Sequence, residues 1–160
     1  MVLLCFLVSC NEAKEESFIL PENAFFLISG DSIKTWKLEK RFNNSHRMNM
    51  GDCFLSYRVS YLRNNTMYDN NGNYSNCGES LKASWKIFTN ENGSFIKLYS
   101  EQLPKLLNQK NTYKYFQLKE ISEEKLIIRF EHRQFSNSVS IIEDHLVPDS
   151  VVVENRDFHY

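Results

Sequence analysis

The side chains that could bind a metal ion or move a proton include four histidines, His46, His132, His145 and His159. They show neither H-E-x-x-H nor H-x-H spacing, so a shared metal ion would need ligands that only the fold brings together. We expect surface or packing roles for all four, and no metal. We also expect no cofactor, because the five glycines form neither a G-x-G-x-x-G nor a G-x-x-x-x-G-K phosphate loop.

Acid–base chemistry has four candidate pairs of sequence neighbours: Glu123-Glu124, Glu143-Asp144, Glu131-His132 and Asp144-His145. Neighbours on a strand point to opposite faces of the sheet, so such a pair cannot act on one substrate atom. A G-x-S-x-G nucleophile motif is also missing. The sequence therefore predicts that this protein is not an enzyme.

The N-terminus is an apolar run that ends at Cys10 and gives way to polar residues. The run is shorter than the roughly 20 residues of a membrane span, but it suits the apolar part of an export signal. Leu7-Val8-Ser9-Cys10 resembles the lipobox of bacterial lipoproteins. This implies a signal peptide over residues 1–9, an acyl chain such as palmitate on Cys10, and a tether to residue 17. The alternative is a buried N-terminal strand or helix, since no Lys or Arg precedes the run.

The tether contains Lys14-Glu15-Glu16, which resembles the short acidic signal that sends some Bacteroidetes lipoproteins to the cell surface. The two resemblances together imply a lipid-anchored protein of the bacterial cell envelope, at the outer membrane and with surface exposure. The alternative for the three residues is a solvated charged linker.

Cys53 and Cys77 are the cysteines that remain once Cys5 leaves with the signal and Cys10 carries the lipid. In an exported protein, two such cysteines most simply form a disulfide. A redox or metal role is the weaker alternative, because the pair has no C-x-x-C spacing and no neighbouring histidine.

Composition indicates one globular domain over residues 18–160. The 160-residue chain is 42% hydrophobic and 14% aromatic, which is too apolar for intrinsic disorder. Its net charge is −1, without clusters of Lys and Arg, so we expect no nucleic-acid partner.

Side chains along the domain alternate with a period of two, which is typical of half-buried strands. The predicted strands are Thr35–Glu39, Leu55–Tyr61, Ser84–Phe88, Ser94–Tyr99, Thr112–Ile121, Lys125–Glu131, Val139–Leu146 and Ser150–Glu154. Predicted turns between them contain Asn71-Gly72 and Asn92-Gly93, which suit positive φ angles, and also Ser122-Glu123-Glu124 and Pro148-Asp149.

The short spacing of these strands predicts an all-β protein, an antiparallel up-and-down barrel of about eight to ten strands. Val139–Val153 is predicted to form a C-terminal hairpin extension around Pro148-Asp149. Glu101–Asn108 is expected to be an ordered loop or a single helical turn, since Pro104 interrupts its apolar spacing. Ser17–Gly30 is expected to dock on the domain.

The order of several motifs resembles the lipocalin-like domains of Bacteroidetes lipoproteins over roughly residues 33–130. These motifs are Trp36, Asp52-Cys53, the Tyr68–Tyr74 segment, Cys77 and Ser84-Trp85. The resemblance implies a small barrel, a Cys53–Cys77 pair and no catalytic residues. Ala83-Ser84 stands where the family usually has glycine, and residues 132–160 extend beyond its usual last strand.

Aromatic side chains at alternating positions could line a pocket for a small apolar or amphipathic ligand. These residues are Trp36, Tyr57, Tyr61, Trp85, Tyr113 and Tyr115. The alternative is a barrel that its own side chains fill, in an envelope protein that uses its exterior face to bind a protein partner.

Overall fold

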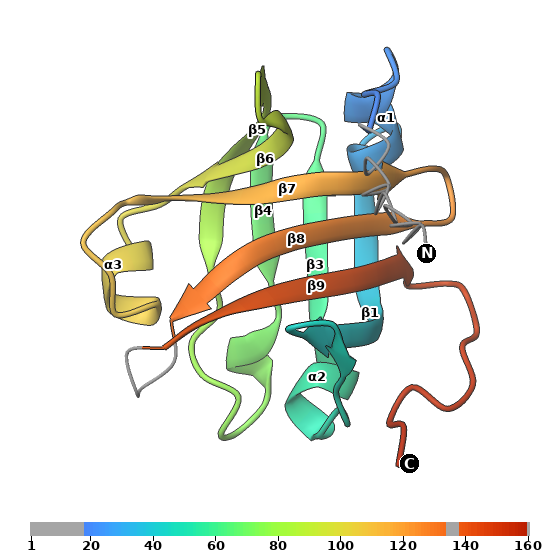
Figure 1. Ribbon diagram of the computed structural model, residues 1–160, viewed down its shortest axis with the longest axis vertical. Coiled ribbons are helices and arrows are strands. Elements are labelled where there is room, and N and C mark those ends of the chain that lie inside the picture. The colour runs from blue at the N-terminus through green and yellow to red at the C-terminus, as the bar shows by residue number, and fades with distance from the viewer. Residues whose placement is uncertain (1–17, 134–137, 160) are drawn as a thin grey trace, which may run out of the picture.

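The computed structural model describes residues 18–133 and 138–159. Its strands form a single antiparallel sheet in the order β2-β1-β3-β4-β5-β6-β7-β8-β9, and β9 also pairs with β1. This additional pairing closes eight of the strands into a barrel and leaves β2 as a short extra strand (Figure 1). The predicted antiparallel up-and-down barrel is confirmed.

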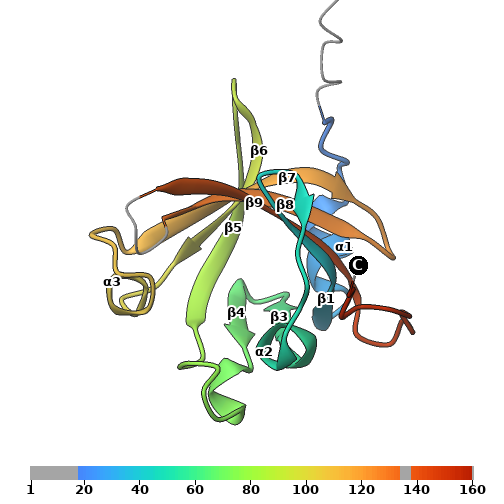
Figure 2. The same cartoon turned by 60° about the horizontal axis from the view of Figure 1, so that its bottom comes forward.

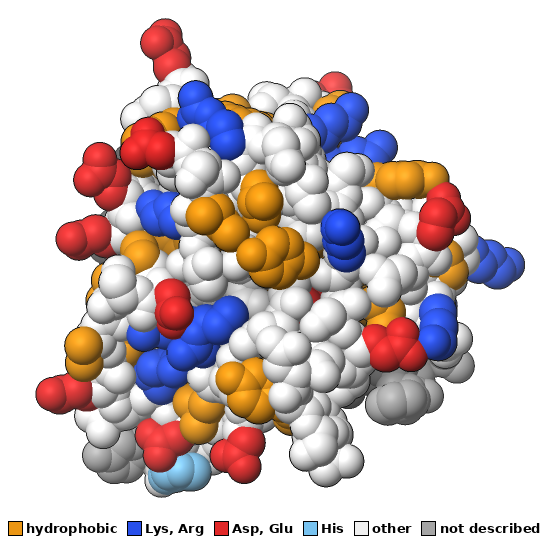
Figure 3. Space-filling model, turned by 180° about the vertical axis from the view of Figure 1, so that it is seen from behind, with side chains coloured by type: hydrophobic (Ala, Val, Ile, Leu, Met, Phe, Trp, Pro, Cys, Tyr) orange, Lys and Arg blue, Asp and Glu red, His pale blue; other side chains and the backbone are white. Residues whose placement is uncertain are grey.

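The strands run over β1 (Ile33–Asn43), β2 (His46–Arg47), β3 (Arg58–Leu62), β4 (Thr66–Asp69), β5 (Lys82–Asn90), β6 (Gly93–Tyr99), β7 (Tyr113–Ile121), β8 (Leu126–Arg133) and β9 (Val139–Pro148). Figure 2 shows β7, β8 and β9 crossing over the side of the barrel formed by β1, β3, β4 and β5. The outer face of that side carries charged side chains of both signs between small groups of hydrophobic ones (Figure 3).

Three short α-helices and one 3₁₀ turn accompany the strands within the described residues: α1 (Ala24–Ser29), α2 (Asp52–Ser56), α3 (Leu103–Leu106) and the 3₁₀ turn η1 (Asn71–Asn73). The predicted single turn within residues 101–108 is confirmed as α3, with Pro104 in its first turn. In the part of the chain that the structure describes, no helix is long and apolar enough to cross a membrane.

Helix α1 closes one end of the barrel. Ile28 is fully buried there, and its carbonyl accepts a 2.9 Å hydrogen bond from the indole N–H of Trp36. Phe25 stacks on Trp85 with 4.6 Å between the ring centroids. The expectation that this segment docks on the domain is confirmed for residues 18–30.

The predicted strand Leu55–Tyr61 was wrong in its first half. Asp52 to Ser56 form α2, and β3 begins only at Arg58. An acidic residue is favourable in the first turn of a helix, where Asp52 lies, and the Ser56 hydroxyl donates a 2.7 Å hydrogen bond to the Asp52 carbonyl. These local interactions override the alternating pattern.

The predicted Asn71-Gly72 hairpin turn was also wrong, because these residues belong to η1 and neither has a positive φ. The Asp69 carboxylate shapes this connection by accepting hydrogen bonds from the N–H groups of Asn71 and Leu81, at 3.1 and 3.2 Å. The chain instead adopts positive φ angles at Asn76 and Gly78, within a long loop between β4 and β5.

The other predicted reversals agree better with the structure. Asn90 pairs with Gly93 across the hairpin between β5 and β6, although only Gly93 has a positive φ. The turn that contains Ser122 joins β7 to β8, and the Ser122 N–H donates to the Lys125 carbonyl at 2.8 Å.

The predicted C-terminal hairpin was wrong, since β9 ends at Pro148 and Ser150–Glu154 is not a strand. Strand β9 already pairs with β8 on one side and with β1 on the other, so no edge remains for another strand. The last residues instead follow the outside of the barrel, where Arg156 donates to the Leu38 carbonyl at 2.7 Å and the Asp157 carbonyl accepts from the Met50 N–H at 3.0 Å.

Candidate functional site

The barrel encloses a cavity of about 820 Å³, so its interior is not filled by its own side chains. The deeper wall is apolar, because inward-facing positions of successive strands carry aliphatic side chains: Val59, Met67, Leu98, Leu126, Ile128, Ile142 and Leu146. A volume of this size falls within the range of about 300 to 1,000 Å³ that holds drug-sized ligands.

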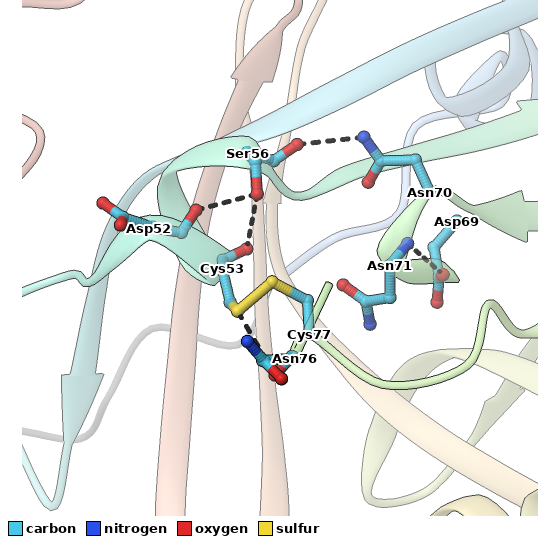
Figure 4. Close-up of a disulfide and its surroundings, with 8 residues drawn as sticks. All are labelled: Asp52, Cys53, Ser56, Asp69, Asn70, Asn71, Asn76 and Cys77. Atoms are coloured by element: carbon cyan, nitrogen blue, oxygen red, sulfur yellow. Dashed lines mark hydrogen bonds between the residues drawn. A yellow bond between two sulfur atoms is a disulfide. The ribbon is translucent and has the colours of Figure 1, made fainter. Parts of the chain in front are cut away.

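The mouth of the cavity is formed by α2, α3 and the loop that follows η1. Phe54, Cys53, Cys77 and Leu106 all line it. The predicted disulfide is confirmed: it joins Cys53 to Cys77 with 5.3 Å between their Cα atoms, and it ties α2 to the loop (Figure 4).

A second link holds α2 against this loop. The Asn70 amide donates to the Ser56 carbonyl at 2.9 Å, and its oxygen accepts from the Arg58 N–H at 2.7 Å. One asparagine side chain thus bridges the end of α2 and the start of β3, while the disulfide lies on the far side of the helix turn (Figure 4). The mouth is therefore fixed by covalent and polar links rather than by burial.

An ion pair crosses the cavity wall between β1 and β9. Arg41 donates to both carboxylate oxygens of Asp144, from Nε at 2.5 Å and from Nη2 at 2.6 Å. Burial lowers the pKa of Arg41, but the hydrogen bond and charge of Asp144 raise it by more, so its pKa lies above the ordinary value. This guanidinium stays charged, and its charge is matched by that of Asp144.

Two further basic side chains line the cavity from β7 and β8. Burial, together with the nearby charge of Arg41, lowers the pKa of Lys114 to about 8. The Lys114 ammonium lies 4.6 Å from the ring centroid of Phe130 and 5.5 Å from that of Phe116. Burial and the charges of Lys114 and Arg41 also lower the pKa of His132, which is therefore neutral at pH 7.

The opposite wall carries phenols and one carboxyl group. Burial raises the pKa values of Tyr57 and Tyr61, so both phenols are protonated over the whole physiological range. Burial also raises the pKa of Asp69, although hydrogen bonds from the backbone of Asn71 and Leu81 oppose this effect. These groups can donate or accept hydrogen bonds inside an otherwise apolar space.

The six aromatic residues expected in a pocket divide into three pairs. Tyr57 and Tyr61 line the cavity. Trp36 and Trp85 are buried near α1 and do not line it.

The expectation was wrong for Tyr113 and Tyr115, which are 39% and 37% exposed on the outer face. Their neighbours Lys114 and Phe116 occupy the inward positions of β7, since successive side chains of a strand alternate between its faces. Both faces of this strand carry aromatic side chains, so the sequence pattern alone did not show which face is inside.

Sequence reasoning missed Arg41, Lys114 and Asp144 as cavity residues. The available signal was their alternation with apolar residues, such as Lys114 two positions before Phe116 and Asp144 between Ile142 and Leu146. Charged side chains at inward positions are rare unless they are paired or functional, which makes them informative.

The candidate acid–base pair Glu143-Asp144 is split between the two faces of β9, as expected for neighbours on a strand. Asp144 points inward, whereas Glu143 lies outside and contacts Arg129 and His145, each at 2.9 Å. Burial raises the pKa of Glu143, but the hydrogen bonds from His145 and Arg129 lower it by more.

Across residues 18–133 and 138–159, no group of three or more His, Cys, Asp and Glu side chains is placed to hold a metal ion. The signal peptide over residues 1–9, Cys10 and the tether lie outside the described residues.

No protein-family model and no curated protein matches this sequence. Among solved structures, a lipocalin-like protein from Bacteroides uniformis ATCC 8492 resembles this chain with a TM-score of 0.48 and 7% sequence identity. The match covers 76% of this chain and 97% of that protein. The assignment of an up-and-down barrel therefore rests on the strand order and on the pairing of β1 with β9.

Proposed function

We propose that this protein binds a small apolar or amphipathic molecule in its barrel. The observation that carries the proposal is the cavity of about 820 Å³, which has an aliphatic deep wall and a few polar groups. Specific small-molecule sites combine these two features: apolar area supplies affinity, and convergent polar groups orient the ligand. The closed sheet supports the proposal, since strands on several sides of the barrel contribute side chains to this cavity.

A pair of adjacent tryptophan substitutions on β9 tests this proposal. Ile142 lines the cavity, whereas Ile141 is 40% exposed on the outer face. Ile142→Trp places an indole ring in the cavity and narrows it, and we expect this change to weaken binding of the neutral fluorescent probe N-phenyl-1-naphthylamine at least tenfold. Ile141→Trp is the matched control and leaves binding unchanged. Equal binding of the probe by both variants and the unmodified protein, or no binding by any of them, would contradict the proposal.

Native mass spectrometry of the protein purified from its own cells addresses the natural ligand. A retained small molecule that Ile142→Trp removes and Ile141→Trp keeps would identify it. A molecule that both variants retain would lie outside the cavity.

We further propose that a lipid on Cys10 holds the barrel at the bacterial cell envelope, with exposure on the cell surface. The lipobox-like Leu7-Val8-Ser9-Cys10 sequence and the Cys53–Cys77 disulfide support this, because disulfides persist in oxidising compartments. Palmitate labelling should disappear in Cys10→Ala. Surface proteolysis should decrease in Lys14→Ala, and unchanged proteolysis would contradict the role of Lys14-Glu15-Glu16 as a surface signal.

A second candidate function is the binding of an envelope protein through the outer face of β5, β6 and β7. The observation that favours it is an exposed aromatic group in which Phe88 and Tyr113 each contact Tyr115, with centroids 5.9 and 5.5 Å apart. A Tyr113→Ala/Tyr115→Ala variant should lose a crosslinked partner in cells and keep probe binding. Retention of every crosslink in that variant would count against this surface.

A further inference from the structure

We infer that the cavity takes a long-chain carboxylate, with its anionic head at Lys114 near the mouth and its aliphatic tail directed toward α1. This inference rests on the proposed binding function and specifies the chemical class of the ligand. Its basis is the ammonium group of Lys114, which lies in the cavity wall without an ion-pair partner among the described residues.

Lys114 is the basic side chain of the cavity wall that forms no ion pair with a described carboxylate. Asp144 matches Arg41 through two hydrogen bonds of 2.5 and 2.6 Å. Glu79, at the mouth, is paired with Lys105 at 2.5 Å. Asp69 is held by the backbone N–H groups of Asn71 and Leu81.

No carboxylate of the described residues lies within ion-pair distance of Lys114, although the charge of Asp144 acts to raise its pKa. Its ammonium group lies over the rings of Phe116 and Phe130. An ammonium group that is half-buried in apolar surroundings is costly unless a counter-ion accompanies it. The ring faces compensate for only part of this cost. An anionic head at this position would complete the pairing.

The orientation of the ligand in the cavity follows from the course of β7 between the mouth and α1. This strand begins at Tyr113, shortly after α3 at the mouth, and its far end packs near α1. Lys114 is its second residue, so the ammonium group lies on the mouth side. Beyond it the wall is aliphatic, with Leu126 and Leu146 as direct neighbours across β8 and β9. A polar head at the mouth and an apolar tail in the depth match this gradient.

The unmatched charge favours a monoanion. Lys114 supplies one positive charge, and His132 is neutral because burial and its cationic neighbours lower its pKa. The neutral imidazole can still donate one hydrogen bond to a head group. A carboxylate fits one ammonium and one neutral donor, whereas a phosphate monoester dianion would leave negative charge uncompensated in a low-dielectric site.

The experiment compares two ligands with the same tail, hexadecanoate and hexadecan-1-ol, as competitors of N-phenyl-1-naphthylamine on the full chain. We expect hexadecanoate to bind at least tenfold more tightly than the alcohol at pH 7. Lys114→Met should weaken hexadecanoate binding about 10- to 100-fold, the range for loss of one hydrogen bond to a charged group, and leave the alcohol unchanged. Lys114→Arg should retain the preference for the acid.

The matched control is Lys97→Met on the neighbouring strand β6. Its ammonium group lies over the exposed rings of Tyr113 and Tyr115, at 5.0 and 5.2 Å, so the change removes one positive charge without touching the cavity. We expect no change in either affinity.

A pH series provides an independent readout. Lys114 has a pKa of about 8, so hexadecanoate affinity should fall as the pH rises through 8, while that of the alcohol stays constant. The charged and titratable groups that face Lys114 are Arg41, Asp144 and His132. The pKa of Arg41 is raised and that of His132 is lowered, so neither group titrates between pH 7 and 10.

The outcomes separate the two proposals. If the alcohol and the probe bind but the acid binds no better, and Lys114→Met changes nothing, the carboxylate inference is overturned and the binding function stands. Tighter binding of hexadecyl phosphate than of hexadecanoate would also overturn the carboxylate assignment. If none of these molecules binds, both proposals fail.

Discussion

The environment of the Asp144 side chain is determined by the face of β9 on which it lies. Its neighbours Glu143 and His145 form a partly exposed pair on the outside, whereas Asp144 is 4% exposed and lies inside against Arg41. An ion pair in this position contributes little net stability relative to apolar residues, yet it is expensive to break, because the remaining partner would be left charged and buried.

At the residue scale we therefore predict that Asp144→Ala lowers the free energy of unfolding by about 3 kcal/mol or more. Urea denaturation measures the change. The control is Asp149→Ala, which removes a carboxylate whose side chain is 46% exposed beside Arg58 and should cost less than about 1 kcal/mol. Equal losses for the two variants would show that burial of the pair does not matter.

The lowered pKa of Lys114 predicts a pH dependence of stability. Its pKa is about 8 in the folded protein and near 10.5 when the chain is unfolded, so the unfolded chain binds more protons between these values. Stability contributed by this group must therefore rise with pH from 8 to 10.5. Unfolding curves at several pH values should show Lys114→Met losing its stability advantage over the unmodified protein across this window. A constant difference would contradict the assigned pKa.

At the scale of elements, the mouth of the cavity is stabilised by different interactions from those that stabilise the rest of the barrel. Helix α2 has five residues and none of them is fully buried. An isolated helix of this length does not form in water, since its nucleation cost is never recovered. The Cys53–Cys77 bond and the Asn70 bridge take the place of a core.

We predict that a Cys53→Ala/Cys77→Ala variant is less stable by roughly 3 to 4 kcal/mol, from the chain entropy of a loop that spans 24 positions. Hydrogen exchange should increase first in residues 52–56 and 71–79, and less in β8 and β9. Adding a reductant should destabilise the unmodified protein and leave the variant unaffected. Uniform loss of protection over the whole barrel would argue against a local role for the disulfide.

At the scale of the whole molecule, the pairing of β1 with β9 decides the architecture. It joins the first long strand to the last and removes the two edges that an open sheet would present. The same closure encloses the cavity, because Arg41 of β1 meets Asp144 of β9 only across this seam. Folding of the barrel and formation of the site are thus one event.

Two truncations separate the contribution of the closing strand β9 to folding from that of residues 151–160. A chain without residues 139–160 should not fold, since β1 and β8 would both become open edges, and we expect aggregation in circular dichroism and gel-filtration experiments. A chain without residues 151–160 keeps β9 and loses the hydrogen bonds of Arg156 and Asp157, which should cost about 1 to 3 kcal/mol. A folded, monomeric product of the longer truncation would contradict the role of β9.

Local patterns in the sequence determined the strands, the disulfide and the overall class of this protein. Alternation of apolar and polar residues depends only on the two-residue repeat of a strand, which is why β6, β7, β8 and β9 could be predicted. The same patterns failed where side chains form short local links, as around Asp52 and Asp69, because such hydrogen bonds do not follow a period.

The tertiary structure alone decided which face of each strand is inside and whether the barrel is hollow. Tyr113 and Lys114 are neighbours on one strand, and either parity of β7 would have placed aromatic side chains inside. Whether side chains fill a barrel depends on the register of all its strands and on their inward volumes together, which no local pattern contains. For this reason Cys53 and Cys77 could be paired from the sequence, whereas the cavity of Arg41, Lys114 and Asp144 emerged only when β1, β7 and β9 closed around it.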